Sequence, residues 1–71
     1  MRALRDVSGK DAIKAFKRLG FAFARQRGSH VILRRGADTA VVPDHPAIRI
    51  GTLHRLLAQS NVTVDDFSGQ L

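Results

Sequence analysis

The chain has 71 residues and no cysteine, and its 12 Lys and Arg against 6 Asp give a formal net charge of +6. A chain of this length forms one small domain that buries only about 60% of its unfolded surface. Without cysteine it can hold neither disulfides nor thiolate metal sites. No apolar stretch has the length of a membrane span or of a secretory signal. We therefore expect a single cytoplasmic domain over residues 1–71, with its core between about 7 and 67 and no membrane contact.

Nine of the twelve cations are arginine. The planar guanidinium pairs better with phosphate than the lysine ammonium does. A strongly basic surface on so small a domain attracts polyanions, most often nucleic acid. A surface that is basic only for solubility is the alternative interpretation.

A first helix is predicted over residues 9–19. Ser8 stands three residues before Asp11, which resembles a capping box with Asp in place of Glu. Gly20 suits the left-handed cap at the other end. The apolar residues between them form one helical stripe, Ala12, Ile13, Phe16 and Leu19. The cations lie on or beside the other face, namely Lys10, Lys14, Lys17 and Arg18.

Three strands are predicted to follow as an antiparallel meander. Alternation over residues 21–27 indicates the first, with one side formed by Phe21, Phe23 and Arg25. Gly28 and Ser29 make a two-residue hairpin connection, with Gly first as a type II′ turn requires. The second strand covers residues 30–35 and the third residues 39–42, where Pro43 ends it. All four phenylalanines are assigned to the core.

A second helix is predicted next, with Thr52 as its N-cap and Asn61 ending it in the left-handed region. Its buried stripe is Leu53, Leu56 and Leu57. The following apolar residues should fold back as a short clamp, Val62, Val64 and Phe67. The order α-β-β-β-α predicts an α+β fold like that of double-stranded-RNA-binding domains, a three-stranded antiparallel sheet with two helices on one face. The other face would be left to solvent or a ligand.

The segment 27–35 places an imidazole among guanidinium groups. The Gly28-Ser29 turn leads directly to His30, and the candidate RNA-binding residues Arg25, Arg27, Arg34 and Arg35 lie on the same hairpin, the first three as candidate phosphate clamps. RNA carries its own nucleophile, the 2′-hydroxyl, so cleavage needs only proton transfer and charge stabilisation, which imidazole and guanidinium groups can supply without metal or cofactor. From the residues alone, a polar strand residue with no chemical role is an equally weighted interpretation of His30.

The other two histidines are weaker candidates. His45, in a loop bracketed by two prolines, could be the partner of His30 in proton transfer or a phosphate ligand, and an exposed residue without a role is the alternative. His54 is expected at the surface of the second helix. The spacing of the three histidines does not match known zinc sites, so no metal is predicted.

The lysines of the first helix, Lys10, Lys14 and Lys17, occupy the element that contacts RNA in double-stranded-RNA-binding folds. A solvated helix face is an equal alternative. No exposed aromatic platform is expected, so stacking on single-stranded bases has little support.

The sequence resembles the HicA-type toxins of toxin–antitoxin pairs. The resemblance rests on four ordered segments: Val7-Ser8-Gly9-Lys10; Leu19-Gly20-Phe21; Arg25-Gln26-Arg27-Gly28-Ser29-His30; and Val42-Pro43 with His45, then Gly51-Thr52-Leu53 and Leu56-Leu57. They extend over nearly the whole chain, from about residue 7 to 67. The stretch 44–49 departs from the family's basic loop, being richer in proline and aliphatic residues and poorer in lysine.

The resemblance implies a small ribonuclease that cuts messenger RNA and is neutralised by a HicB-type antitoxin. It assigns catalysis to His30, with Gly28 and Ser29 shaping its turn. We therefore expect a HicA-like, metal-independent endoribonuclease with RNA and an antitoxin as partners and no small-molecule cofactor. The alternatives are a non-catalytic double-stranded RNA- or DNA-binding module of the same fold and, more weakly, a structural accessory subunit.

Overall fold

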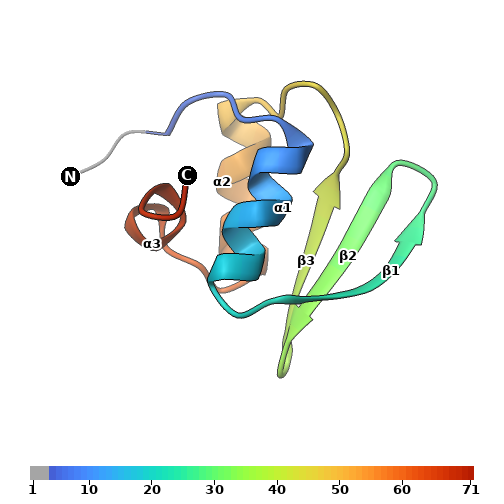
Figure 1. Ribbon diagram of the computed structural model, residues 1–71. Coiled ribbons are helices and arrows are strands. Elements are labelled where there is room, and N and C mark those ends of the chain that lie inside the picture. Colours follow the sequence, from blue (N-terminus) through green and yellow to red (C-terminus); the bar gives the residue numbers. More distant parts are fainter. Residues whose placement is uncertain (1–3) are drawn as a thin grey trace.

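The computed structural model describes residues 4–71, which form one antiparallel sheet and three helices (Figure 1). The elements are α1 (Gly9–Arg18), β1 (Ala22–Arg27), β2 (His30–Arg35), β3 (Asp38–Pro43), α2 (Ile50–Gln59) and α3 (Val64–Ser68). The strand order is β1-β2-β3, and α1 and α2 pack against β3 on one face of the sheet. The predicted α+β order is thus confirmed. No helix within residues 4–71 is long and apolar enough to span a bilayer.

Helix α1 has the predicted caps. The Ser8 hydroxyl accepts a hydrogen bond from the Asp11 amide at 3.1 Å, and Gly20 takes a left-handed φ of +97°. The Phe21 amide then donates back to the Phe16 carbonyl at 3.0 Å, the bond of a Schellman cap. Because Phe21 belongs to this cap, β1 begins one residue later than the alternation predicts.

Helix α2 starts earlier than predicted. Its N-cap is Arg49, which makes no side-chain capping bond, so the assignment of Thr52 as N-cap is wrong. The chain is fixed there by tertiary contacts instead, since Val7 and Ile48 exchange backbone hydrogen bonds of 3.2 and 2.6 Å. Ile48, two residues before α2 begins, is buried at 2% exposure. At the other end Asn61 has a φ of +59°, as predicted.

Strand β1 contains a bulge that changes which side its residues face. Phe23 lies opposite Leu33, but Arg25 lies opposite the next residue of β2, Ile32, so Ala24 is an extra residue. Directly paired residues share a face of the sheet. Phe23 therefore faces the helix side with Leu33, while Arg25 faces the opposite side. The prediction that Phe23 and Arg25 point the same way is wrong.

The core holds three of the four phenylalanines. Phe16 packs against Phe21 and Phe67, with ring centroids 5.1 and 5.4 Å apart. Phe23 is 55% exposed, although it faces the helix side, because β1 is the strand farthest from the helices (Figure 1). Its assignment to the core is wrong. The apolar residues after α2 do fold back, and Phe67 on α3 is fully buried.

Gly9 brings the first turn of α1 into backbone contact with the loop after β3. Its amide donates to the His45 carbonyl at 2.8 Å. A Cβ on this residue would collide with the Pro43 carbonyl and would lie 2.7 Å from Asp44 Cα and 2.9 Å from His45 N. Only glycine therefore fits between the helix and this loop.

We predict that Gly9→Ala lowers the free energy of unfolding by about 1–3 kcal/mol, because backbone atoms must move apart to admit the methyl group. Gly51→Ala is the matched control, since a Cβ there meets nothing within 4 Å and alanine favours the helix by about 0.5–1 kcal/mol. Denaturant unfolding of both variants gives the comparison. Equal stabilities for the two variants would contradict the close approach at Gly9.

Candidate functional site

The face of the sheet away from the helices, called here the open face, carries one titratable imidazole and three guanidinium groups. Strand register assigns to it Ala22, Arg25, Arg27, His30, Ile32, Arg34, Thr39, Val41 and Pro43. His30 and the three arginines are exposed. Within residues 4–71 none of these guanidinium groups is occupied by a hydrogen bond or an ion pair. The open face can therefore offer its cations to an anionic ligand.

His30 is the first residue of β2 and is held by a well-bonded turn. It lies between Arg27 of β1 and Pro43 of β3 in the ladder. Gly28 has a φ of +58° and Ser29 does not have a positive φ, in agreement with the predicted type II′ turn. The Ser29 carbonyl accepts from the Asp44 amide at 2.6 Å, and Gln26 donates its side-chain amide to the Gly28 carbonyl at 3.0 Å. The turn that precedes His30 is therefore held by hydrogen bonds from β1 and from the loop after β3.

His45 lies near the N-terminal end of β2, where His30 is also located. It is exposed, two residues after Pro43, which pairs with His30. Together with Ser8, Lys10, Asp44 and Pro46 it lines a hollow of about 320 Å³. No hydrogen bond between the two imidazoles is present in residues 4–71. The two histidines therefore lie near the same end of β2, but they are not hydrogen-bonded to each other.

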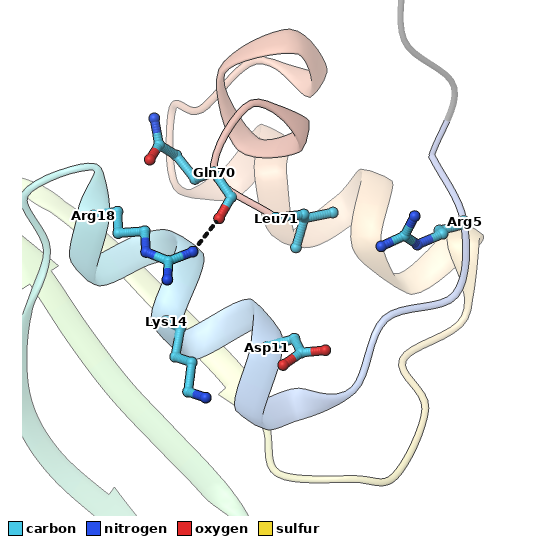
Figure 2. Close-up of a pocket in the computed structure, with 6 residues that line it drawn as sticks. All are labelled: Arg5, Asp11, Lys14, Arg18, Gln70 and Leu71. Carbon is cyan, nitrogen blue, oxygen red and sulfur yellow. Dashed lines mark hydrogen bonds between the residues drawn. The ribbon is translucent and has the colours of Figure 1, made fainter.

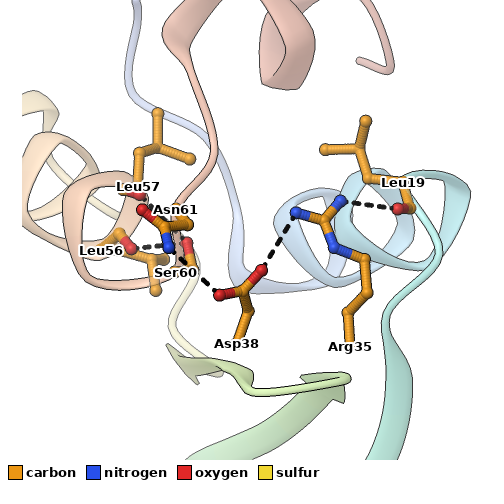
Figure 3. A network of polar contacts seen from close by, with 7 residues as sticks. All are labelled: Leu19, Arg35, Asp38, Leu56, Leu57, Ser60 and Asn61. Carbon is orange, nitrogen blue, oxygen red and sulfur yellow. Dashed lines mark hydrogen bonds and ion pairs between the residues drawn. The ribbon is translucent and has the colours of Figure 1, made fainter.

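Arg35 is separated from the other predicted RNA-binding arginines. It donates to the Leu19 carbonyl at 2.9 Å and pairs with Asp38 at 3.4 Å (Figure 3). Its guanidinium carbon also lies 4.5 Å from the centre of the Phe21 ring. Asp38 in turn accepts from the Asn61 side chain at 3.2 Å. Arg35 thus links the end of α1 to the β2–β3 turn, and its partner Asp38 links that turn to the end of α2.

The predicted lysines are exposed on α1, on the helix side of the sheet. Lys10 lines the hollow beside His45. Lys14 borders a second hollow of about 190 Å³ with Arg5, Asp11, Arg18, Gln70 and Leu71 (Figure 2). Arg18 there donates to the Gln70 carbonyl at 2.7 Å. The helix layer therefore separates Lys14 from the open face. No group of three His, Asp or Glu side chains in residues 4–71 is placed to hold a metal ion.

Two features of this region were not expected from the sequence. The bulge at Ala24 puts Phe23 on the helix side while Arg25 and Arg27 face the open side with His30, whereas unbroken alternation places Phe23 and Arg25 on one side. The exposure of Phe23 follows from the distance between β1 and the helices. The polar run 25–27 is the sequence signal that could have indicated an exposed edge strand, because charged residues are typical of such strands.

The element order, the helices on one sheet face and the cationic open face define a small basic α+β protein with the α-β-β-β-α arrangement. Residues 9–62 match the family model of the HicA toxin of bacterial toxin–antitoxin systems. The chain therefore belongs to the HicA toxin family and is the toxin of a toxin–antitoxin system, which implies a partner antitoxin. Comparison with curated proteins and with solved structures gave no match.

Adjacent arginines of β2 should differ in their contribution to stability. We predict that Arg35→Gln lowers the free energy of unfolding by about 1–2 kcal/mol, because it removes a charged hydrogen bond and a cation–π contact. Arg34→Gln, on the open face, should change it by less than about 0.5 kcal/mol. Urea unfolding of both variants tests this, and a larger loss in Arg34→Gln would be inconsistent with the contacts described.

Proposed function

We propose that the protein is an endoribonuclease that cleaves messenger RNA on the open face, with His30 as general base or general acid. The observation that carries the proposal is the strand register, which puts His30 with Arg25, Arg27 and Arg34 on one exposed face. Membership of a toxin family supports an activity that harms the cell, and the net charge of +6 supports a polyanionic substrate.

The proposed reaction uses the nucleophile that RNA already contains. One imidazole removes the proton of a 2′-hydroxyl as its oxygen attacks the neighbouring phosphorus. The bond from phosphorus to the 5′-oxygen then breaks, and a second group donates a proton to that oxygen. The products are a 2′,3′-cyclic phosphate and a 5′-hydroxyl, and no electron donor or acceptor is needed. Guanidinium groups stabilise the additional negative charge on the phosphorane. This route uses no metal ion.

His45 is the proposed second proton-transfer group. Its loop adjoins the end of β2 where His30 lies, through the Ser29–Asp44 backbone bond. Lys10 in the same hollow could hold a phosphate of the bound RNA. Gly28 and Ser29 act through the turn that positions His30 and do not take part in the chemistry.

The proposed partner is a HicB-type antitoxin with an acidic surface. A toxin with a net charge of +6 is bound fastest and most selectively by a protein of opposite charge. Since messenger RNA is the proposed substrate, the proposed location is the cytoplasm.

We predict that His30→Ala slows RNA cleavage by about 10²–10⁴-fold, the usual contribution of a general acid or base. Affinity for RNA should change little, because the arginines remain. His54→Ala, another exposed histidine, is the matched control and should cleave at the wild-type rate. Assays use antitoxin-free protein with excess chelator, with cleavage followed on gels and binding by anisotropy. Equal RNA binding without cleavage by wild type and variant would instead indicate a non-catalytic binding module.

For His45 we predict that alanine slows cleavage of ordinary RNA by about 10²–10⁴-fold but not of RNA with a 5′-thio leaving group. Sulfur leaves without being protonated, so a general acid becomes unnecessary. His30→Ala should stay slow on both substrates if His30 is the base. An equal defect of His45→Ala on both substrates would rule out the role of acid for His45.

A further inference from the structure

We propose that the free edge of β1 binds an added β-strand from the antitoxin, an acidic extended segment with an apolar residue that covers Phe23. The existence of an antitoxin follows from the family, and its acidic character rests on the proposed function above. Strand addition to a sheet edge is a common mode of protein recognition, in which backbone bonds give affinity and alternate side chains give specificity.

Strand β1 offers an unpaired edge. It pairs with β2 on one side only, and all six of its residues are exposed. Within residues 4–71 no other segment lies along its outer side. The opposite edge of the sheet is less suitable, since β3 ends at Pro43, which has no amide hydrogen to donate, and α1 and α2 pack against that strand.

Phe23 gives this edge an apolar anchor. It faces the same side as the fully buried Leu33, yet it is 55% exposed because the helix layer does not extend over β1. Aromatic residues, Phe among them, are enriched at protein interfaces relative to the rest of the surface. An added strand would bring an apolar side chain next to this ring.

The charges on the other side of β1 determine which strand fits. Arg25 and Arg27 both face the open side. Two copies of this chain paired edge to edge would bring these arginines close together, which is unfavourable. An antitoxin strand with Asp or Glu at the neighbouring positions would instead form cross-strand ion pairs. The occupant is therefore a strand that alternates acidic and apolar residues.

This mode of docking also explains how the strand would inhibit the toxin. Arg25 and Arg27 are proposed phosphate ligands of the open face, and Arg27 lies directly opposite His30. Acidic side chains paired with these two arginines would take the place of the RNA phosphates. Inhibition would then need no contact with the imidazole itself.

The test uses the complete protein with the antitoxin encoded in its own gene pair. Phe23→Lys should weaken antitoxin binding at least about tenfold and leave cleavage of RNA by the free toxin unchanged, since Phe23 is not on the open face. Ile50→Lys is the matched control, because Ile50 is an apolar residue with 41% exposure at the start of α2. It should alter neither property. Circular dichroism verifies that both variants fold.

Hydrogen exchange supplies the second measurement. The proposal predicts that antitoxin binding newly protects the amides of β1 that do not bond to β2, with no such change along β3. Unchanged affinity of Phe23→Lys, or an unprotected β1 in the complex, would overturn it. Concentration-dependent protection of β1 in the toxin alone would show pairing of two copies and would also overturn it. If β1 behaves as predicted but no RNA is cleaved, docking stands and the nuclease function fails.

Discussion

The placement of His30 depends on the cross-strand register of β2. Val31 and Leu33 are buried at 6% and 0% exposure, and they fix which side of this central strand meets the helices. Because side chains alternate, a slip of one residue would turn Leu33 to solvent and His30 toward the core. The apolar residues of β2 thus specify the position of the polar ones, and the free energy of core burial holds the imidazole on the open face.

Two neighbouring residues of β2 have different roles, one structural and one available for ligand binding. Arg34 and Arg35 are adjacent and chemically identical, yet one lies free on the open face and the other is held by a carbonyl, a carboxylate and an aromatic ring. Free guanidinium groups attract a polyanion, whereas satisfied ones help to close a core that is small for its surface.

Much of this arrangement could be predicted from the sequence, because local signals dominate it. The bounds of β2, the Ser8 cap and the left-handed Gly20 and Asn61 all follow from short-range patterns. Three features depend on distant contacts and could not be predicted in this way. The bulge at Ala24 is set by pairing with β2, the start of α2 by the Val7–Ile48 bridge, and the exposure of Phe23 by the extent of the helix layer. The roles of His30 and His45 stay predictions.

The backbone contact of Gly9 has a further consequence for how this small protein works. Side-chain contacts can loosen by changing rotamer, but the approach of Gly9 to residues 43–45 is backbone against backbone. Helix α1 and the loop of His45 therefore move as one body or separate altogether. Through Pro43 and the Ser29–Asp44 bond, that body also includes the first residue of β2. The place of the His45 loop beside the start of β2 therefore depends on the docking of α1, so the position of His45 relative to His30 is a property of the tertiary fold and not of the hairpin alone.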